Sequence, residues 1–142
     1  MAGILRRNNT FLAVRRPEGK VMAGYWEFPG GKMEPGETAL EALSRELEEE
    51  LGVTESVGEF WQTMTHTYAH GHVTLHVFFV DSFTGEPTPL ENQELRWTTP
   101  TAARHLDFLP ADKPLVRELE HSQEKSWRDL AAKENSARGQ EI

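Results

Sequence analysis

The chain contains no cysteine and no long hydrophobic run. Without cysteine it has no disulfide, no thiol nucleophile and no zinc site built from thiolates. Its longest strongly apolar run is Val77-Phe78-Phe79-Val80, far shorter than the roughly 20 residues of a membrane-spanning helix. We therefore expect a cytoplasmic protein without a membrane segment.

Positive charge is also scarce. The 142 residues include 15 Lys and Arg against 23 Asp and Glu, a formal net charge of -8. An acidic surface repels the phosphate backbone of DNA or RNA, so a nucleic-acid polymer is a poor candidate for the ligand. An anionic small molecule would need a neutralising partner, and a divalent cation held by carboxylates is one that this composition offers.

The length suits one domain with an ordinary core, which we assign to residues 1–133, with a frayed polar tail at 134–142. Apolar periodicity and turn residues predict its elements. The predicted strands are two within 2–15 around a turn at Asn8-Asn9, then 60–68, 72–80 and 95–97; the predicted helices are 38–51, 100–104 and a long one from Ala111 that includes Trp127 and Leu130. Residues 16–37 are predicted to be a loop. The pattern indicates an α/β fold with a mixed sheet between helices.

The helix over residues 38–51 has the clearest signals. Thr38 with Glu41 three residues later forms a capping box, leucines recur every three or four positions, and Gly52 ends the run. Its residues Glu46, Glu49 and Glu50 project from one side. A solvated acidic face is one interpretation of these three acids. A site for a hard cation such as Mg²⁺ is the other.

The residues around this helix follow a longer pattern. Gly31, Glu37 and the segment Arg45–Val53 match GX5EX7REUXEEXGU, where U is a bulky aliphatic residue. This is the Nudix box, and the chain resembles MutT-like Nudix hydrolases from near residue 2 to about residue 120. The resemblance implies an α/β/α sandwich. It also implies a Mg²⁺-dependent enzyme, with Mn²⁺ as an alternative ion, that splits a nucleoside triphosphate into the monophosphate and pyrophosphate.

The resemblance also implies roles for single residues. The metal ligands would be the Gly30 carbonyl and the carboxylates of Glu46, Glu49, Glu50 and Glu91. Glu46 is the expected general base, with Glu91 as the alternative. Arg45 and Glu37 are expected to form an ion pair that orients the loop against the helix. Gly31 and Gly52 are expected to be structural residues that support the site.

A further set of residues is expected to bind the substrate: Arg16, Glu27, Phe28, Lys32, Phe78 and Asp112. Arg16 and Lys32 would meet phosphates. Phe28 and Phe78, together with Tyr68, would either offer stacking surface or belong to the core. Asp112 lies in a Pro-Ala-Asp segment that resembles a nucleobase pocket, and an ionised carboxylate there accepts hydrogen bonds from N–H groups of either guanine or cytosine.

The substrate therefore stays open at this point. The first hypothesis is an 8-oxo-dGTP diphosphatase that sanitises the nucleotide pool for DNA replication and repair. The second is a pyrophosphohydrolase of CTP, dCTP or 5-methyl-dCTP, and the third a non-catalytic Nudix-fold binding module. A monomer is expected, with a dimer through the C-terminal helix as the alternative. The four histidines between His66 and His76 are interpreted as a polar hairpin face and not as a zinc site.

Overall fold

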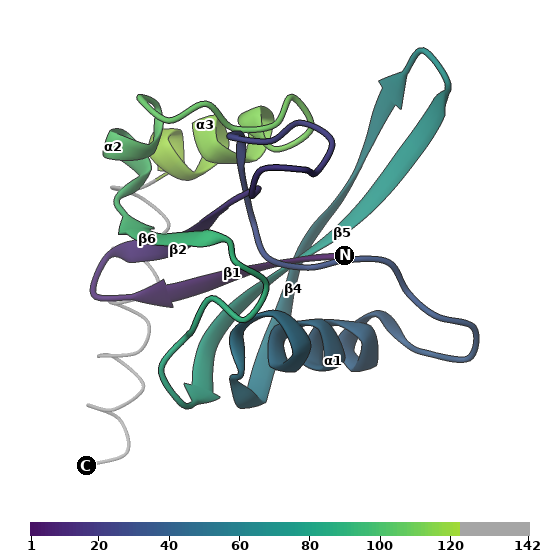
Figure 1. Cartoon of the computed structure of the whole chain (residues 1–142), viewed down its shortest axis with the longest axis vertical. Coiled ribbons are helices and arrows are strands. Elements are labelled where there is room, and N and C mark those ends of the chain that lie inside the picture. The colour runs from purple at the N-terminus through teal and green to yellow at the C-terminus, as the bar shows by residue number, and fades with distance from the viewer. Residues whose placement is uncertain (123–142) are drawn as a thin grey trace.

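The computed structural model describes residues 1–122, in which helices cover both faces of a mixed sheet (Figure 1). The elements in chain order are β1 Ala2–Arg7, β2 Thr10–Arg15, β3 Trp26–Glu27, α1 Ala39–Leu51, β4 Thr54–Tyr68, β5 Gly71–Thr84, β6 Glu94–Thr98, α2 Pro100–Ala103 and α3 Lys113–Ser122. The predicted continuation of the last helix through Trp127 and Leu130, the tail at 134–142 and the dimer through that helix lie outside the described residues.

The sheet is built around the N-terminal hairpin. Asn8 and Asn9 have φ values of 52° and 65°, which their short polar side chains tolerate. The path of paired strands runs β3-β2-β1-β5-β4, and β6 also pairs with β2. β1 is parallel to β5, whereas the other pairs are antiparallel, so the predicted mixed sheet is confirmed.

Two predictions about strands were wrong. The loop predicted over 16–37 contains β3, whose two residues are too few to show any periodicity. The hairpin of β4 and β5 is longer than predicted, because β4 begins at Thr54 and β5 ends at Thr84. Register shifts between Thr54 and Phe60 disrupt the alternation of side chains there, so the sequence pattern does not reveal this part of the strand.

Each face of the sheet has its own hydrophobic cluster. The cluster beneath α1 joins its Leu43, Leu47 and Leu51 to side chains of the sheet such as Leu5. The opposite cluster joins α2 and α3 to the other face of the strands. Figure 1 shows α1 on one side of the strands and α2 with α3 on the other. The expected α/β/α sandwich is confirmed.

The predicted caps of α1 are also present. Thr38 and Glu41 make the two reciprocal hydrogen bonds of a capping box, and Gly52 closes the helix at φ 70°. The chain turns at Gly52 directly into β4, so the acidic last turn of α1 lies close to the sheet. Among the described residues, no helix is long and apolar enough to cross a membrane.

Candidate active site

The loop before α1 is fixed against the start of β1. The Gly3 N–H donates to the Pro29 carbonyl at 2.8 Å, and the Gly31 N–H donates to the Met1 carbonyl at 3.1 Å. A β-carbon built on Gly31 would lie only 2.6 Å from Glu46 Oε1. Glycine at this position therefore lets the loop backbone lie directly against an acid of α1.

Arg45 holds this loop and the acids of α1 together. Its Nε and Nη2 donate to the two carboxylate oxygens of Glu37 at 2.8 and 2.9 Å, which is the predicted ion pair. Its Nη1 lies 3.0 Å from Glu46 Oε1 and 3.3 Å from Glu49 Oε2. Hydrogen bonds from Arg45 hold the pKa of Glu37 at about 2, so Glu37 stays ionised.

Glu50 is the most strongly perturbed acid of the helix. Its Oε2 accepts a hydrogen bond from the Gly30 backbone N–H at 3.2 Å. Burial, followed by the negative charges of Glu46 and Glu91, raises its pKa to about 8. A carboxylate in this position is disfavoured until a positive charge arrives beside it.

Glu91 approaches these acids on the loop between β5 and β6. The Thr88 N–H donates to the Leu51 carbonyl at 2.9 Å, so the loop is docked on the end of α1. Glu50 and Glu91 line one cavity of about 220 Å³, whose wall also includes Arg16, Glu27, Gly30 and Gly31. We call this the acidic cavity. The sequence places Glu50 and Glu91 41 positions apart, and the fold brings them together.

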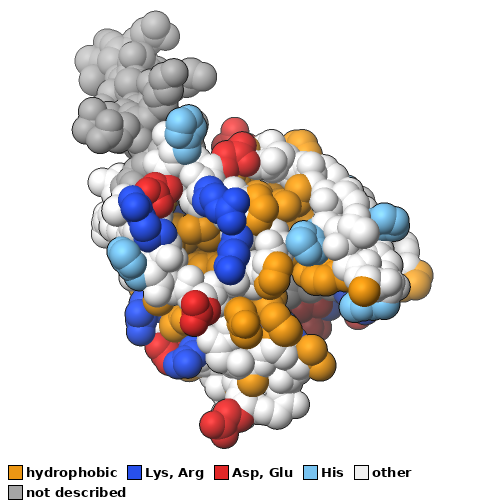
Figure 2. Space-filling view, turned by 90° about the horizontal axis from the view of Figure 1, so that it is seen from above, with side chains coloured by type: hydrophobic (Ala, Val, Ile, Leu, Met, Phe, Trp, Pro, Cys, Tyr) orange, Lys and Arg blue, Asp and Glu red, His pale blue; other side chains and the backbone are white. Residues whose placement is uncertain are grey.

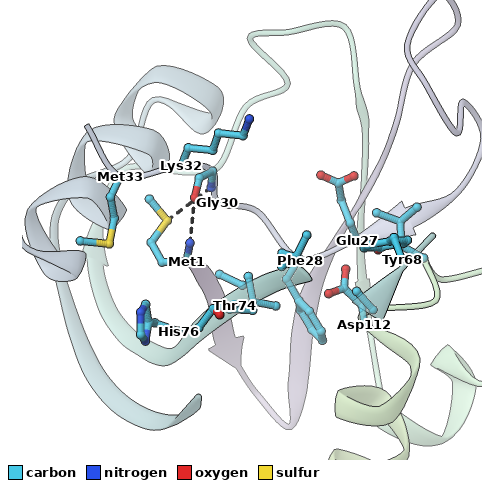
Figure 3. Close-up of a pocket in the computed structure, with 16 residues that line it drawn as sticks. Met1, Glu27, Phe28, Gly30, Lys32, Met33, Tyr68, Thr74, His76 and Asp112 are labelled. Carbon is cyan, nitrogen blue, oxygen red and sulfur yellow. Dashed lines mark hydrogen bonds between the residues drawn. The ribbon is translucent and has the colours of Figure 1, made fainter. Parts of the chain in front are cut away.

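A second cavity of about 410 Å³ adjoins the first, and we call it the apolar cavity. It is lined by Phe28, Tyr68, Leu75, Leu109 and other mainly apolar side chains, with Asp112 among them. Figure 3 shows Glu27 and Asp112 at the end of this cavity near Tyr68, Met33 and His76 at the opposite end, and Lys32 beside Gly30. Glu27, Gly30 and Gly31 line both cavities. A single ligand lying across these three residues would therefore reach into both.

Asp112 is the titratable group buried in the apolar cavity. Its side chain is almost wholly buried, with 6% exposed. Burial first and the charge of Glu27 second raise its pKa to about 7, although a hydrogen bond from the Phe28 backbone N–H favours ionisation. Near neutral pH this carboxyl is therefore present in both forms, one that donates a hydrogen bond and one that only accepts.

The two basic residues predicted to meet phosphates lie in different cavities. Arg16 Nη1 forms an ion pair with Glu27 Oε2 at 2.7 Å, and Arg16 Nε donates to the Val21 carbonyl at 2.7 Å. Arg16 lines the acidic cavity, whereas Lys32 lines the apolar one. Arg16 therefore shares a cavity with Glu50 and Glu91, whereas Lys32 does not line that cavity.

The comparisons with known proteins agree with this geometry. A family model described as the NUDIX domain matches residues 1–118. The chain belongs to the Nudix hydrolase family. It is 39% identical over 116 residues to an Escherichia coli K12 protein named CTP pyrophosphohydrolase, covering 82% of this chain and 86% of that one. It is 36% identical over 118 residues to the E. coli K12 8-oxo-dGTP diphosphatase, covering 82% and 92%.

A solved structure supports the same fold. The solution structure of the E. coli ORF135 protein superimposes on this Nudix chain with a TM-score of 0.76 at 36% sequence identity, covering 86% of this chain and 87% of that one. The predicted Nudix box thus lies on the loop, helix and acids described above.

Nudix hydrolases generally need a divalent metal, usually Mg²⁺, and the acids of this chain fit one. In the part of the chain that the structure describes, no group of three or more acidic or histidine side chains is gathered to hold an ion by itself. Instead, Arg45 donates hydrogen bonds to Glu46 and Glu49, and the Gly30 backbone N–H donates one to Glu50. Mg²⁺ commonly takes only one or two carboxylates and completes its shell with water and substrate phosphates. Glu50, which is half-buried and repelled by the charges of Glu46 and Glu91, supplies such a donor.

Not every predicted residue reaches a cavity. Phe78 lies in the hydrophobic cluster beneath α1, 6% exposed, and is not among the residues that line the apolar cavity. Adjacent residues of a strand face opposite sides, and it is Leu75 and Val77 that join the other cluster. Phe78 is therefore a core residue in this structure, which is the second of the two interpretations given for it.

One residue of the acidic cavity was missed. Gln93 is buried and lines that cavity beside Glu50 and Glu91. A glutamine two positions after a loop acid carries no recognisable pattern in a single sequence, so only the fold reveals it.

The histidines of the hairpin make local contacts. Thr67 Oγ1 lies 2.9 Å from His72 Nδ1, and the rings of His66 and Tyr68 meet edge to face at 4.4 Å. In Figure 2, seen from the side of α2 and α3, histidine and hydrophobic side chains lie together at the right-hand end, where Figure 1 places the hairpin tip. His76 and Tyr68 line the apolar cavity. The tip thus forms one wall of that cavity.

Proposed function

We propose that the protein is a Mg²⁺-dependent nucleoside triphosphate pyrophosphohydrolase. The observation that carries the proposal is the junction of the two cavities at Glu27, Gly30 and Gly31. A nucleoside triphosphate has an apolar, flat end and a highly charged end joined by a sugar. Its phosphates would lie in the acidic cavity, its base in the apolar cavity and its sugar beside Glu27, whose carboxylate accepts hydrogen bonds from sugar hydroxyls.

The metal would be held by Glu46, Glu49, Glu50, Glu91 and the Gly30 carbonyl, an all-oxygen set that suits Mg²⁺, with Mn²⁺ as an alternative. When bound, it would neutralise the phosphates, lower the pKa of water and stabilise the charge that develops on phosphoryl oxygens. Without such an ion, the net charge of -8 would oppose binding of a triphosphate.

The chain's own residues then orient and move protons. Glu46 is the proposed acceptor of the proton of the attacking water, with Glu91 as the alternative. Arg45 positions Glu46 through the hydrogen bond at 3.0 Å, while its two bonds to Glu37 hold its guanidinium in place. Arg16, which lines the acidic cavity, would contact the phosphates and would then exchange part of its pairing with Glu27.

The favoured substrate is 8-oxo-dGTP. The neutral form of Asp112 both donates and accepts, which suits the guanine edge, where a carbonyl acceptor stands beside N–H donors. Tyr68 supplies a partly exposed ring in the same cavity, whereas Phe28 lines it from the hydrophobic core, where it is 4% exposed. The relative at 36% identity bears the name 8-oxo-dGTP diphosphatase. An enzyme of this kind would remove oxidised nucleotides from the cytoplasmic pool, acting on a small molecule and not on a nucleic-acid polymer.

A second candidate is hydrolysis of CTP or of its deoxy and 5-methyl derivatives. The ionised form of Asp112 accepts a hydrogen bond from the N4 amine of cytosine, and the relative at 39% identity is named CTP pyrophosphohydrolase. Both candidates share the metal site and the reaction; they differ in the base and, for CTP, also in the sugar. A non-catalytic module has less support, because these relatives are named as enzymes and all the acids of the box are present.

The reaction is tested by identifying the products with ³¹P NMR after incubation of 8-oxo-dGTP and of CTP with Mg²⁺. Attack between the α- and β-phosphates gives the monophosphate and pyrophosphate. Formation of the diphosphate and inorganic phosphate would contradict the proposed reaction. The Glu49→Gln variant is the control, since it should abolish turnover and leave the fold intact.

A further inference from the structure

Gln93 connects two acids of the acidic cavity through a single buried side chain. Its Nε2 donates to the Glu50 carbonyl at 3.0 Å, and its Oε1 accepts from the Glu91 backbone N–H at 2.8 Å. The side chain is 7% exposed and lines the cavity that Glu50 and Glu91 also line. Both ends of the amide are therefore used, and both are directed at the backbone of an acid.

The Glu50 carbonyl is available for this contact because it lies in the last turn of α1. Carbonyls of a final helical turn have no N–H partner within the helix. The Leu90 N–H also donates to the Glu50 carbonyl, at 3.2 Å, and the Thr88 N–H donates to that of Leu51. These two backbone bonds dock the middle of the loop, and neither involves Glu91. The Gln93 amide adds the connection to Glu91 itself.

The connection matters because Glu50 and Glu91 carry like charges into one small cavity. Like charges repel, and a loop held only at Thr88 and Leu90 would allow Glu91 to move away from Glu50. The two part-buried hydrogen bonds of the Gln93 amide resist such movement, because breaking either one would separate a polar group from its partner. The amide thereby opposes the repulsion between the two carboxylates.

We propose that Gln93 is a positioning residue that fixes the spacing of Glu50 and Glu91 for the divalent metal. The proposal rests on the proposed function, because it takes these two acids as metal ligands. Gln93 itself is not a ligand in this account. Its side-chain amide acts through the two backbones that it joins, and it should therefore govern metal affinity more than nucleotide affinity.

The test compares Gln93→Met with the unaltered chain. Methionine keeps the length of the side chain and removes both hydrogen bonds. Binding of Mn²⁺ to the full chain without nucleotide, measured by isothermal titration calorimetry, should weaken about tenfold or more, as is typical when a residue supporting a metal ligand is lost. With saturating Mg²⁺ the KM for nucleotide should stay nearly constant, while the Mg²⁺ concentration for half-maximal kcat rises.

Gln62→Met is the matched control. Gln62 also donates through its side-chain amide, at 2.9 Å to Glu118, but it is on the hairpin strand β4 and does not line the acidic cavity. Its replacement should leave the Mn²⁺ Kd unchanged. If Gln93→Met fails to fold, Gln93→Asn replaces it, because an amide one methylene shorter cannot span both partners and should weaken Mn²⁺ binding in the same way.

A Kd for Mn²⁺ within about twofold of the unaltered value, together with a lower Tm in EDTA, would overturn the proposal and leave Gln93 a merely structural residue. Absence of Mn²⁺ binding by the unaltered chain would overturn it as well. The proposed function fails by a different result. If the unaltered chain binds Mn²⁺ but splits no nucleotide, the effect of Gln93→Met on the Kd still decides the role of Gln93.

Discussion

The Glu50 carboxylate lies 3.2 Å from the Gly30 backbone nitrogen, which donates a hydrogen bond to it. This contact joins the loop before α1 to the last turn of that helix, two segments 20 positions apart. It places a half-buried acid beside Glu46 and Glu91, and partial burial first and the charges of these two acids second raise its pKa. The fold therefore holds an acid where it costs stability, which is expected of a residue kept for its interaction with a cation.

Replacing Glu50 with glutamine should separate stability from activity. The folded-state pKa of about 8 exceeds the ordinary value of 4.5, so the folded chain binds more protons between these values. Stability of the unaltered chain in EDTA should therefore fall as pH rises from 4.5 to 8. Glu50→Gln should remove this loss and raise Tm at pH 8, while kcat with Mg²⁺ falls about 100-fold or more.

The control for this change is Glu48→Gln, because Glu48 is an exposed acid on the same helix. It alters the net charge equally and should change neither kcat nor the pH dependence of Tm. Equal Tm values for Glu50→Gln and the unaltered chain at pH 8 would contradict the burial of a repelled carboxylate.

Gly31→Ala should displace Glu46 without unfolding the protein. The new β-carbon would lie 2.6 Å from the Glu46 carboxyl group, and the end of a flexible side chain moves at modest cost. We expect kcat to fall about tenfold or more and Tm to change little. Gly58→Ala is the control, because its β-carbon would lie 2.8 Å from Leu40 Cδ2, away from the acids. Full activity in Gly31→Ala would show that the position of Glu46 is not critical.

Arg45→Lys tests whether the site needs the several N–H donors of a guanidinium group. Arg45 contacts both oxygens of Glu37 and also Glu46, and a single ammonium cannot reproduce that geometry. Steady-state kinetics should show kcat reduced about 10- to 100-fold, with a smaller change in KM. The lowered pKa of Glu37 contributes stability above pH 4.5 that is lost as pH falls toward 2. Urea unfolding at pH 7 should therefore show Arg45→Lys to be less stable, and the difference should shrink at pH 3.

Asp112 should make base preference depend on pH. Its pKa of about 7 means that the neutral form dominates at pH 6 and the ionised form at pH 8. The ratio of kcat/KM for 8-oxo-dGTP to that for CTP should therefore change with pH around 7, because the ionised form only accepts hydrogen bonds, whereas the neutral form also donates one, and the two bases present different donors and acceptors. Catalytic groups common to both reactions cancel in this ratio.

Asp112→Asn has no such titration, so its ratio should be independent of pH between 5.5 and 8.5. If the kcat/KM ratio of the unaltered chain were equally independent of pH, Asp112 would not determine the base preference. The substitution also removes a buried acid whose pKa is raised from 3.8, so it should stabilise the protein increasingly as pH rises from about 4 to 7.

The sequence predicted the parts of this molecule that depend on local order. The capping box at Thr38, the turn at Asn8-Asn9 and the acids of α1 all lie within short segments, and each is present in the structure. The resemblance to Nudix hydrolases supplied Glu91, which no local pattern marks. Phe78 stayed open between the core and a stacking surface because alternation along a strand does not say which face is which. Gln93 was missed because its partners come from two elements that only the fold brings together.

The proposed reaction needs both the bound metal and this fold to split nucleoside triphosphates. The most direct measurement is the rate of pyrophosphate release from 8-oxo-dGTP, dGTP, CTP, dCTP and 5-methyl-dCTP with Mg²⁺, repeated with EDTA and again after Mg²⁺ is restored. The account predicts release that EDTA abolishes and Mg²⁺ restores, with the highest kcat/KM for 8-oxo-dGTP. No release from any of these nucleotides, or release that EDTA leaves unchanged, would contradict it.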